Sequence, residues 1–261
     1  MTGSQIQIAL AGVLPALVAM WFVDRLDRQR PEPRRLRRLV AVAGMLSVIP
    51  ALVLEVGLTR TPPEYTYQGA SFRSFLAAGV EEACKVVIIF WIVWRRPALD
   101  ERMVGIVHAS RAGLGFALVV NVMYLPVVAR TVDDQLPMWI LHAVLSVPGH
   151  AMWTGMIGAL AARRRFDGRG LGLLGGYLLA VAFHGTYDLA LGVQRPMLLE
   201  GHGGLAWLLM GVPIGLTVLA FFVLRSMART ALRLDDVDAA NAAARAAARI
   251  RGVASSAPAE P

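Results

Sequence analysis

Several apolar segments of about 20 residues each run through this 261-residue sequence. That length is what a helix needs to cross the hydrocarbon core of a bilayer. Because every backbone polar group in lipid must be satisfied internally, only helices and closed barrels can span it. These segments are too long and too evenly apolar for barrel strands, in which apolar and polar residues alternate. The sequence therefore predicts an all-α polytopic membrane protein.

The pattern predicts about seven transmembrane helices, at residues 4–23, 39–58, 72–94, 104–127, 137–162, 171–191 and 204–224. Most of the 26 basic residues lie in four stretches that leave these spans on one side, at 25–38, 95–102, 163–169 and 225–251. Positively charged loops stay in the cytoplasm. We therefore expect a multi-pass protein of a bacterial-type plasma membrane, with its N-terminus outside and its C-terminus in the cytoplasm.

The net charge of +8 comes from the basic residues that lie on the predicted cytoplasmic side. Membrane lipid is the expected partner, and nucleic acid is not. Residues 1–225 form the predicted transmembrane domain, and residues 226–261 form a cytoplasmic tail. The Ala/Arg-rich part of the tail predicts a helix to about Ile250, and Ser255–Pro261 are expected to be disordered. The oligomeric state is not indicated by the sequence.

Charged residues interrupt the third predicted span. Lys85 is the only lysine of the chain, and it follows Glu81 by four residues and Glu82 by three. This spacing places all three side chains on one helix face. A charge at such depth costs about 2.5–3.5 kcal/mol or more, so the default interpretation of the cluster is functional.

Other polar residues lie within later spans. His184 and Asp188 are four residues apart in the sixth, His150 follows Pro148 in the fifth, and Asn121 lies in the fourth. At a rise of about 1.5 Å per residue, all fall between the outer surface and a little past the midplane. We therefore expect one site, open toward the outside.

Carboxylates, histidines, a lysine and an asparagine around a hydrated pocket suit the attack of water on a carbonyl. A glutamate can deprotonate water, a histidine can protonate the leaving amine, and an amide can stabilise the oxyanion. A zinc ion held by His150, His184 and Glu82 is an alternative way to activate the water. A structural ion pair and the ion relay of a coupled transporter are the other interpretations of the same charges.

Four strings on successive predicted helices resemble the PrsW family of intramembrane proteases, which is related to the CAAX-processing and bacteriocin-processing membrane proteases. They are GVEEACKVV, GLGFALVVNVMYL, PGHAMWTGMIGAL and FHGTYDLAL, and together they cover residues 79–192. The resemblance implies that residues 1–225 are a protease domain that cleaves a single-pass membrane protein or peptide. In bacteria such substrates include signalling proteins such as anti-sigma factors.

The resemblance also implies residue roles. By motif position Glu81, Glu82, Lys85, His150 and His184 match the family's catalytic residues. We expect Glu81 to be the general base, Asp188 to orient His184 and Asn121 to donate to the oxyanion. The family is catalogued as metal-dependent, although a metal-free glutamate mechanism has been argued for its relatives.

One position departs from the family pattern. Val120 stands where the second motif usually has a glutamate. Either that glutamate is auxiliary, or this chain is a catalytically degenerate membrane protein that binds and regulates partners. Glu55, near the outer end of the second span, is expected to extend toward the outer surface.

Overall fold

The computed structural model describes residues 3–26, 33–58, 66–94, 99–128 and 142–255. The described residues contain helices and no strand. In chain order the elements are α1 (Gly3–Asp24), α2 (Arg34–Leu46), α3 (Val48–Leu58), α4 (Tyr67–Ile89), the π-helix η1 (Phe90–Trp94), α5 (Arg102–Val128), the π-helix η2 (His142–Ser146), α7 (Val147–Asp167), α8 (Gly172–Gly192), α9 (Gln194–Leu199), α10 (Gly203–Leu208) and α11 (Gly211–Ser255).

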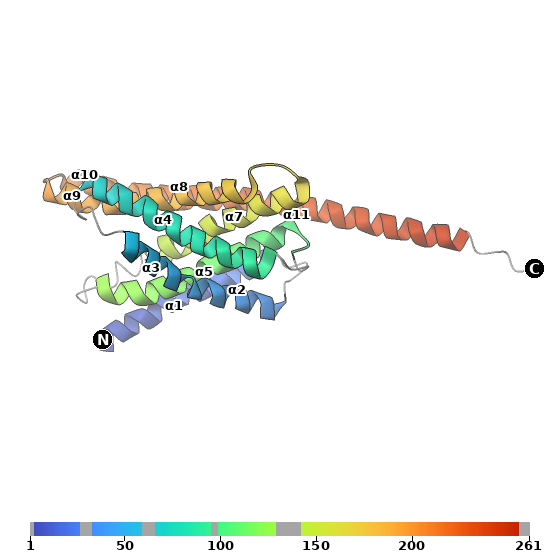
Figure 1. Ribbon diagram of the computed structural model, residues 1–261, viewed down its shortest axis with the longest axis horizontal. Helices are drawn as coiled ribbons and strands as arrows, with labels where there is room; N and C mark the ends of the chain where they lie inside the picture. Colours follow the sequence, from blue (N-terminus) through green and yellow to red (C-terminus); the bar gives the residue numbers. More distant parts are fainter. Residues whose placement is uncertain (1–2, 27–32, 59–65, 95–98, 129–141, 256–261) are drawn as a thin grey trace, which may run out of the picture.

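Helix α5 is the centre of the bundle. It packs against α1, α2 and α7, and α7 in turn packs against α8, which lies beside α4. Every residue of α5 from 102 to 117 is buried. The N-terminal end of α1 and the short helices α9 and α10 lie toward one end of the molecule, while the end of α11 projects from the other (Figure 1).

Among the residues that the structure describes, three helical segments are long and apolar enough to cross a membrane: Arg34–Leu58, Arg102–Met123 and Gly203–Ile250. They coincide with the predicted spans at 39–58, 104–127 and 204–224. The other four predicted spans are largely helical where the structure describes them, although residues 137–141 lie outside the described part. An all-α membrane protein is therefore supported, while the number of spans and their orientation stay predictions.

The second predicted span is divided at Ser47, between α2 and α3. Pro50 has no backbone N–H, so the carbonyl four residues before it loses its helical partner. The Ser47 hydroxyl donates to the carbonyl of Gly44 at 2.6 Å. The break lets α3 leave the direction of α2 and pack against α4.

The predicted tail does not begin a separate element. Residue 225 falls within α11, which runs on to Ser255. Asp235 is buried, and its carboxylate accepts hydrogen bonds from the backbone N–H groups of Arg102 and Met103 at the start of α5. The Arg102 guanidinium also donates to Asp235 and Asp238. The first turns of the tail are thus hydrogen-bonded to α5, whereas residues 239–250 are exposed. Residues 256–261, where disorder is predicted, lie outside the described part.

Glycines allow α5 and α7 to approach closely. A Cβ on Gly113 would lie 2.3 Å from the carbonyl oxygen of His150 and 2.9 Å from the Thr154 hydroxyl oxygen. A Cβ on Gly158 would lie 2.2 Å from the carbonyl oxygen of Gly105. Neither contact is tolerated without moving one helix.

We expect Gly113→Ala to destabilise the protein by about 1–3 kcal/mol, because overpacking forces α7 away from α5. The measurement is the thermal unfolding midpoint of the purified protein in detergent. Gly215→Ala is the matched control, since a Cβ there meets no atom within 4 Å. Equal midpoints for the two variants would show that the close approach has no energetic importance.

Candidate active site

Helix α4 contributes the charged centre of the candidate site. Lys85 and Glu82 are both fully buried, and the Lys85 ammonium donates to Glu82 Oε1 at 2.8 Å. The same ammonium lies 3.4 Å from Glu81 Oε2 and 4.0 Å from the centre of the Phe116 ring on α5. The predicted clustering of these three charges on one helix face is therefore present.

Glu82 has partners at both carboxylate oxygens. Oε1 accepts from Lys85, and Oε2 accepts from the Thr154 hydroxyl on α7 at 2.9 Å. His184 Nδ1 on α8 also lies 3.1 Å from Glu82 Oε1. Because an ionised carboxylate only accepts, Nδ1 of His184 carries the proton of this hydrogen bond. Glu82 thus joins three helices and fixes the orientation of the His184 ring.

The other nitrogen of His184 faces two further carboxylates. Nε2 lies 3.8 Å from Glu81 Oε2 and 3.4 Å from Asp188 Oδ2. The side chains of Glu81 and Asp188 are 15% and 31% exposed, whereas Glu82 is 0% exposed. Part of the surface of Glu81 and of Asp188 is therefore open, whereas Glu82 is enclosed.

His150 brings α7 into the same cluster. Its Nδ1 lies 3.1 Å from Lys85 Nζ, and its ring centre is 4.9 Å from that of His184. Trp153, one turn further along α7, stacks on the His184 ring at 4.3 Å and makes an edge contact with His150. This indole holds both imidazole rings in place from one side.

Glu81, His150 and His184 each offer a ligand atom, and these atoms lie within 4.8 Å of one another. They form a candidate metal site of two imidazoles and one carboxylate, a donor set that zinc accepts. The sequence predicted Glu82 in place of Glu81 for this set. In the structure both oxygens of Glu82 are already bonded to Lys85, His184 or Thr154, so Glu81 rather than Glu82 offers the ligand atom.

The side-chain amide of Asn121 does not bond to the cluster around Glu82 in the structure. Asn121 is 1% exposed, and its amide nitrogen donates to the carbonyl of Gly12 on α1 at 3.3 Å. The hydrogen bond that the structure describes for this amide thus joins α5 to α1 rather than to the residues around Glu82. Its neighbour Val120 packs beside Cys84, Ala51 and Phe116 in an apolar cluster.

Sequence analysis assigned Glu55 to the outer surface, whereas the structure places it near the cluster. Glu55 is partly buried on α3. It lies close enough to interact electrostatically with Glu81, Asp188, His184 and Lys85. One signal was available, because Glu55 follows Ala51 by one helical turn and therefore shares the face that packs inward.

Comparison with known proteins bears on this cluster. A profile described as PrsW family intramembrane metalloprotease matches residues 32–224, about three quarters of the chain. The chain belongs to the PrsW family. It is therefore an intramembrane protease by family, and the matched region contains every residue of the cluster described above.

Curated PrsW proteins show the extent of the similarity. Protease PrsW of Clostridioides difficile (strain 630) is 28% identical over 196 residues, which cover 73% of this chain and 81% of the relative. Protease PrsW of Geobacillus kaustophilus (strain HTA426) is 28% identical over 181 residues, covering 68% and 76%. Protease PrsW of Bacillus subtilis (strain 168) is 27% identical over 188 residues, covering 70% and 82%. No solved structure matches the chain.

Proposed function

We propose that this PrsW-family peptidase hydrolyses a peptide bond of a membrane-associated protein at the cluster formed by Glu81, His150 and His184. The observation that carries the proposal is the convergence of these three side chains from α4, α7 and α8 within 4.8 Å. They adjoin two fully buried charged residues, Glu82 and Lys85. Burying a charge costs free energy, so charges at this depth indicate a functional site.

Glu81 is the proposed general base. It is the partly exposed member of the glutamate pair, and the Lys85 ammonium lies 3.4 Å from its Oε2. An ionised carboxylate can accept the proton of a water molecule as that water attacks the substrate carbonyl. Glu82 positions Lys85 and His184 and does not touch the reacting atoms.

His150 is the proposed donor to the substrate. The Lys85 ammonium can only donate, so Nδ1 of a neutral His150 accepts and Nε2 carries the ring proton. That N–H can donate to the carbonyl oxygen as it becomes an oxyanion, and later to the leaving amine. Asn121, bonded to α1, is not needed for this step.

The donor set fits a zinc ion in type. Glu81, His150 and His184 would hold it, and the bound ion would activate water and polarise a carbonyl. In that form Glu81 and His150 would be metal ligands, so the roles of base and donor given above belong to the metal-free site. In its neutral form His184 suits this role, because Nδ1–H donates to Glu82 and the lone pair of Nε2 is then available to a metal. His150 is not, because Lys85 occupies its Nδ1 while Nε2 carries the proton. Metal binding therefore requires the hydrogen bond between Lys85 and His150 to change.

The proposed substrate is a single-pass membrane protein or peptide, including signalling proteins such as anti-sigma factors. The proposed location is a bacterial-type plasma membrane, with about seven spans, the N-terminus outside and the C-terminus in the cytoplasm. The apolar helices support the membrane location. The start of α1 and the end of α11 lie at opposite ends of the molecule, which supports the proposed orientation (Figure 1).

Metal content tests the zinc part of the proposal. A zinc site predicts about one zinc ion per chain in the purified protein, and it predicts that a strong chelator removes both the zinc and the cleavage activity. His184→Ala should lose the metal, because one of three protein ligands is gone. His202→Ala, which changes an exposed histidine between α9 and α10, should retain it. Cleavage that persists without metal would instead support the metal-free glutamate mechanism.

A further inference from the structure

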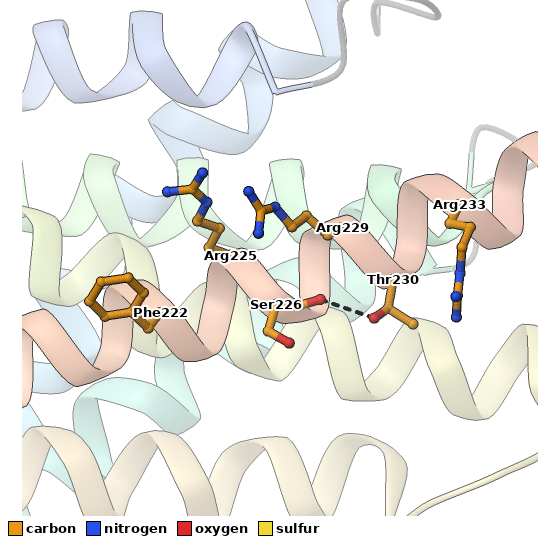
Figure 2. A pocket seen from close by; sticks show the side chains of 6 residues that line it. All are labelled: Phe222, Arg225, Ser226, Arg229, Thr230 and Arg233. Carbon is orange, nitrogen blue, oxygen red and sulfur yellow. Dashed lines mark hydrogen bonds between the residues drawn. The ribbon is translucent and has the colours of Figure 1, made fainter.

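Three arginines follow one another along α11 at intervals of four residues: Arg225, Arg229 and Arg233. We name them the arginine ladder. Residues at this spacing lie on neighbouring turns of one helix face. All three are exposed, and with Phe222, Ser226 and Thr230 they line an open hollow of about 570 Å³. Figure 2 shows the three guanidinium groups projecting away from the helix axis.

The arginine ladder begins where the apolar surface of α11 ends. The preceding turns of the helix expose large apolar side chains, namely Val212, Ile214, Val218, Leu219, Phe221 and Phe222. In a membrane protein such a surface faces lipid tails. The first residue of the arginine ladder therefore lies at the depth where the tails give way to phosphate headgroups.

Asp235, Asp236 and Asp238 follow the arginine ladder on α11, and no ion pair of the described residues joins one of them to it. Asp235 and Asp238 are directed to Arg102 of α5. None of the ion pairs in the described part of the chain involves Arg229 or Arg233. Arg225 lies over the Phe221 ring, with 5.9 Å between the guanidinium carbon and the ring centre, and this contact leaves its charge in place.

We infer that the arginine ladder binds the headgroup of an anionic phospholipid. Guanidinium groups bind phosphate oxygens in a bidentate manner, so successive arginines can grip one phosphodiester and its anionic neighbour. The lipid tails then lie along the apolar turns that precede the arginine ladder. Because the same helix carries Asp235, which caps α5, bound lipid would also fix the height of α11 relative to the bundle.

Matched double variants test this inference on the full-length protein. Arg229→Gln/Arg233→Gln removes two charges of the arginine ladder, and Arg245→Gln/Arg249→Gln removes two charges with the same spacing further along the helix. Arg245 lies about 18 Å beyond Arg233 along α11, which is more than two Debye lengths at physiological ionic strength. The measurement is native mass spectrometry of detergent-solubilised protein titrated with phosphatidylglycerol or with phosphatidylcholine.

We expect phosphatidylglycerol to bind the wild type more tightly than phosphatidylcholine does, and the first double variant to bind it about 30-fold more weakly. The second double variant should lose less than about threefold. Equal losses in the two variants, or no loss in the first, would overturn the inference. Displacement of phosphatidylglycerol by about 10 mM inorganic phosphate would show a site for free phosphate instead.

A charge-preserving variant covers failure of the glutamine pair to fold. Arg229→Lys/Arg233→Lys keeps the topology signal and both positive charges, and it removes the bidentate geometry. We expect phosphatidylglycerol binding to weaken several-fold in this variant. Unchanged binding would contradict the proposed grip of guanidinium on phosphate.

Discussion

Glu81→Gln is expected to lower substrate cleavage at least about 100-fold, because glutamine cannot accept a proton from the attacking water. The substitution keeps the size of the side chain, and Glu82 still neutralises Lys85 at 2.8 Å. The protein should therefore insert into the membrane and unfold at nearly the wild-type temperature. The measurement is the cleavage rate of a single-pass substrate reconstituted with the purified protein.

Glu200→Gln is the matched control for this experiment. It makes the same chemical change at an exposed glutamate, whose carboxylate accepts a hydrogen bond from the Tyr67 hydroxyl. We expect its cleavage rate to stay within about twofold of wild type. Undiminished cleavage by Glu81→Gln would show that Glu81 is not the base. Asp188, the other partly exposed carboxylate near His184, would then be the candidate base.

Lys85→Met is expected to cost about 3–5 kcal/mol of stability, because it leaves the fully buried Glu82 carboxylate without its cation. Methionine fills much of the same volume, so the loss arises mainly from charge rather than from a cavity. The measurement is the shift of the unfolding midpoint in detergent, together with the fraction of protein that inserts into the membrane.

The double variant Lys85→Met/Glu82→Gln separates charge from packing. Removing both charges leaves a neutral amide that can still bond Thr154 and His184. We expect it to regain most of the stability lost by Lys85→Met, since a buried pair is more costly to break than to remove. A double variant as unstable as the single would contradict an uncompensated charge as the cause.

Much of the fold could be predicted from hydropathy, because the apolar length of a segment determines whether it can span a bilayer. The division at Ser47 and the continuity of α11 across residue 225 were not anticipated. Both depend on local hydrogen bonding, which a count of apolar residues does not report. The role of Asp235 as a cap on α5 was also hidden, since its partners Arg102 and Met103 lie more than 130 residues away in the sequence.

The site could be predicted in part. Helical periodicity places Glu81, Glu82 and Lys85 on one face, and His184 with Asp188 on another, whatever the arrangement of the helices. Periodicity does not determine which of two adjacent glutamates turns into the core. That choice depends on partners from other helices, here Thr154 and His184, which select Glu82 for burial and leave Glu81 accessible. The same reason explains why Asn121 was assigned to the site although it bonds to α1.

The central claim is that Glu81, His150 and His184 together activate water against a peptide bond. Mass spectrometry of a single-pass substrate, cleaved by the purified protein in water enriched in oxygen-18, tests it most directly. We expect a new C-terminal carboxylate that carries the heavy oxygen, formed by wild type and absent with Glu81→Gln or His184→Ala. A substrate that stays intact with wild type, or a labelled product of equal yield from both variants, would contradict the account.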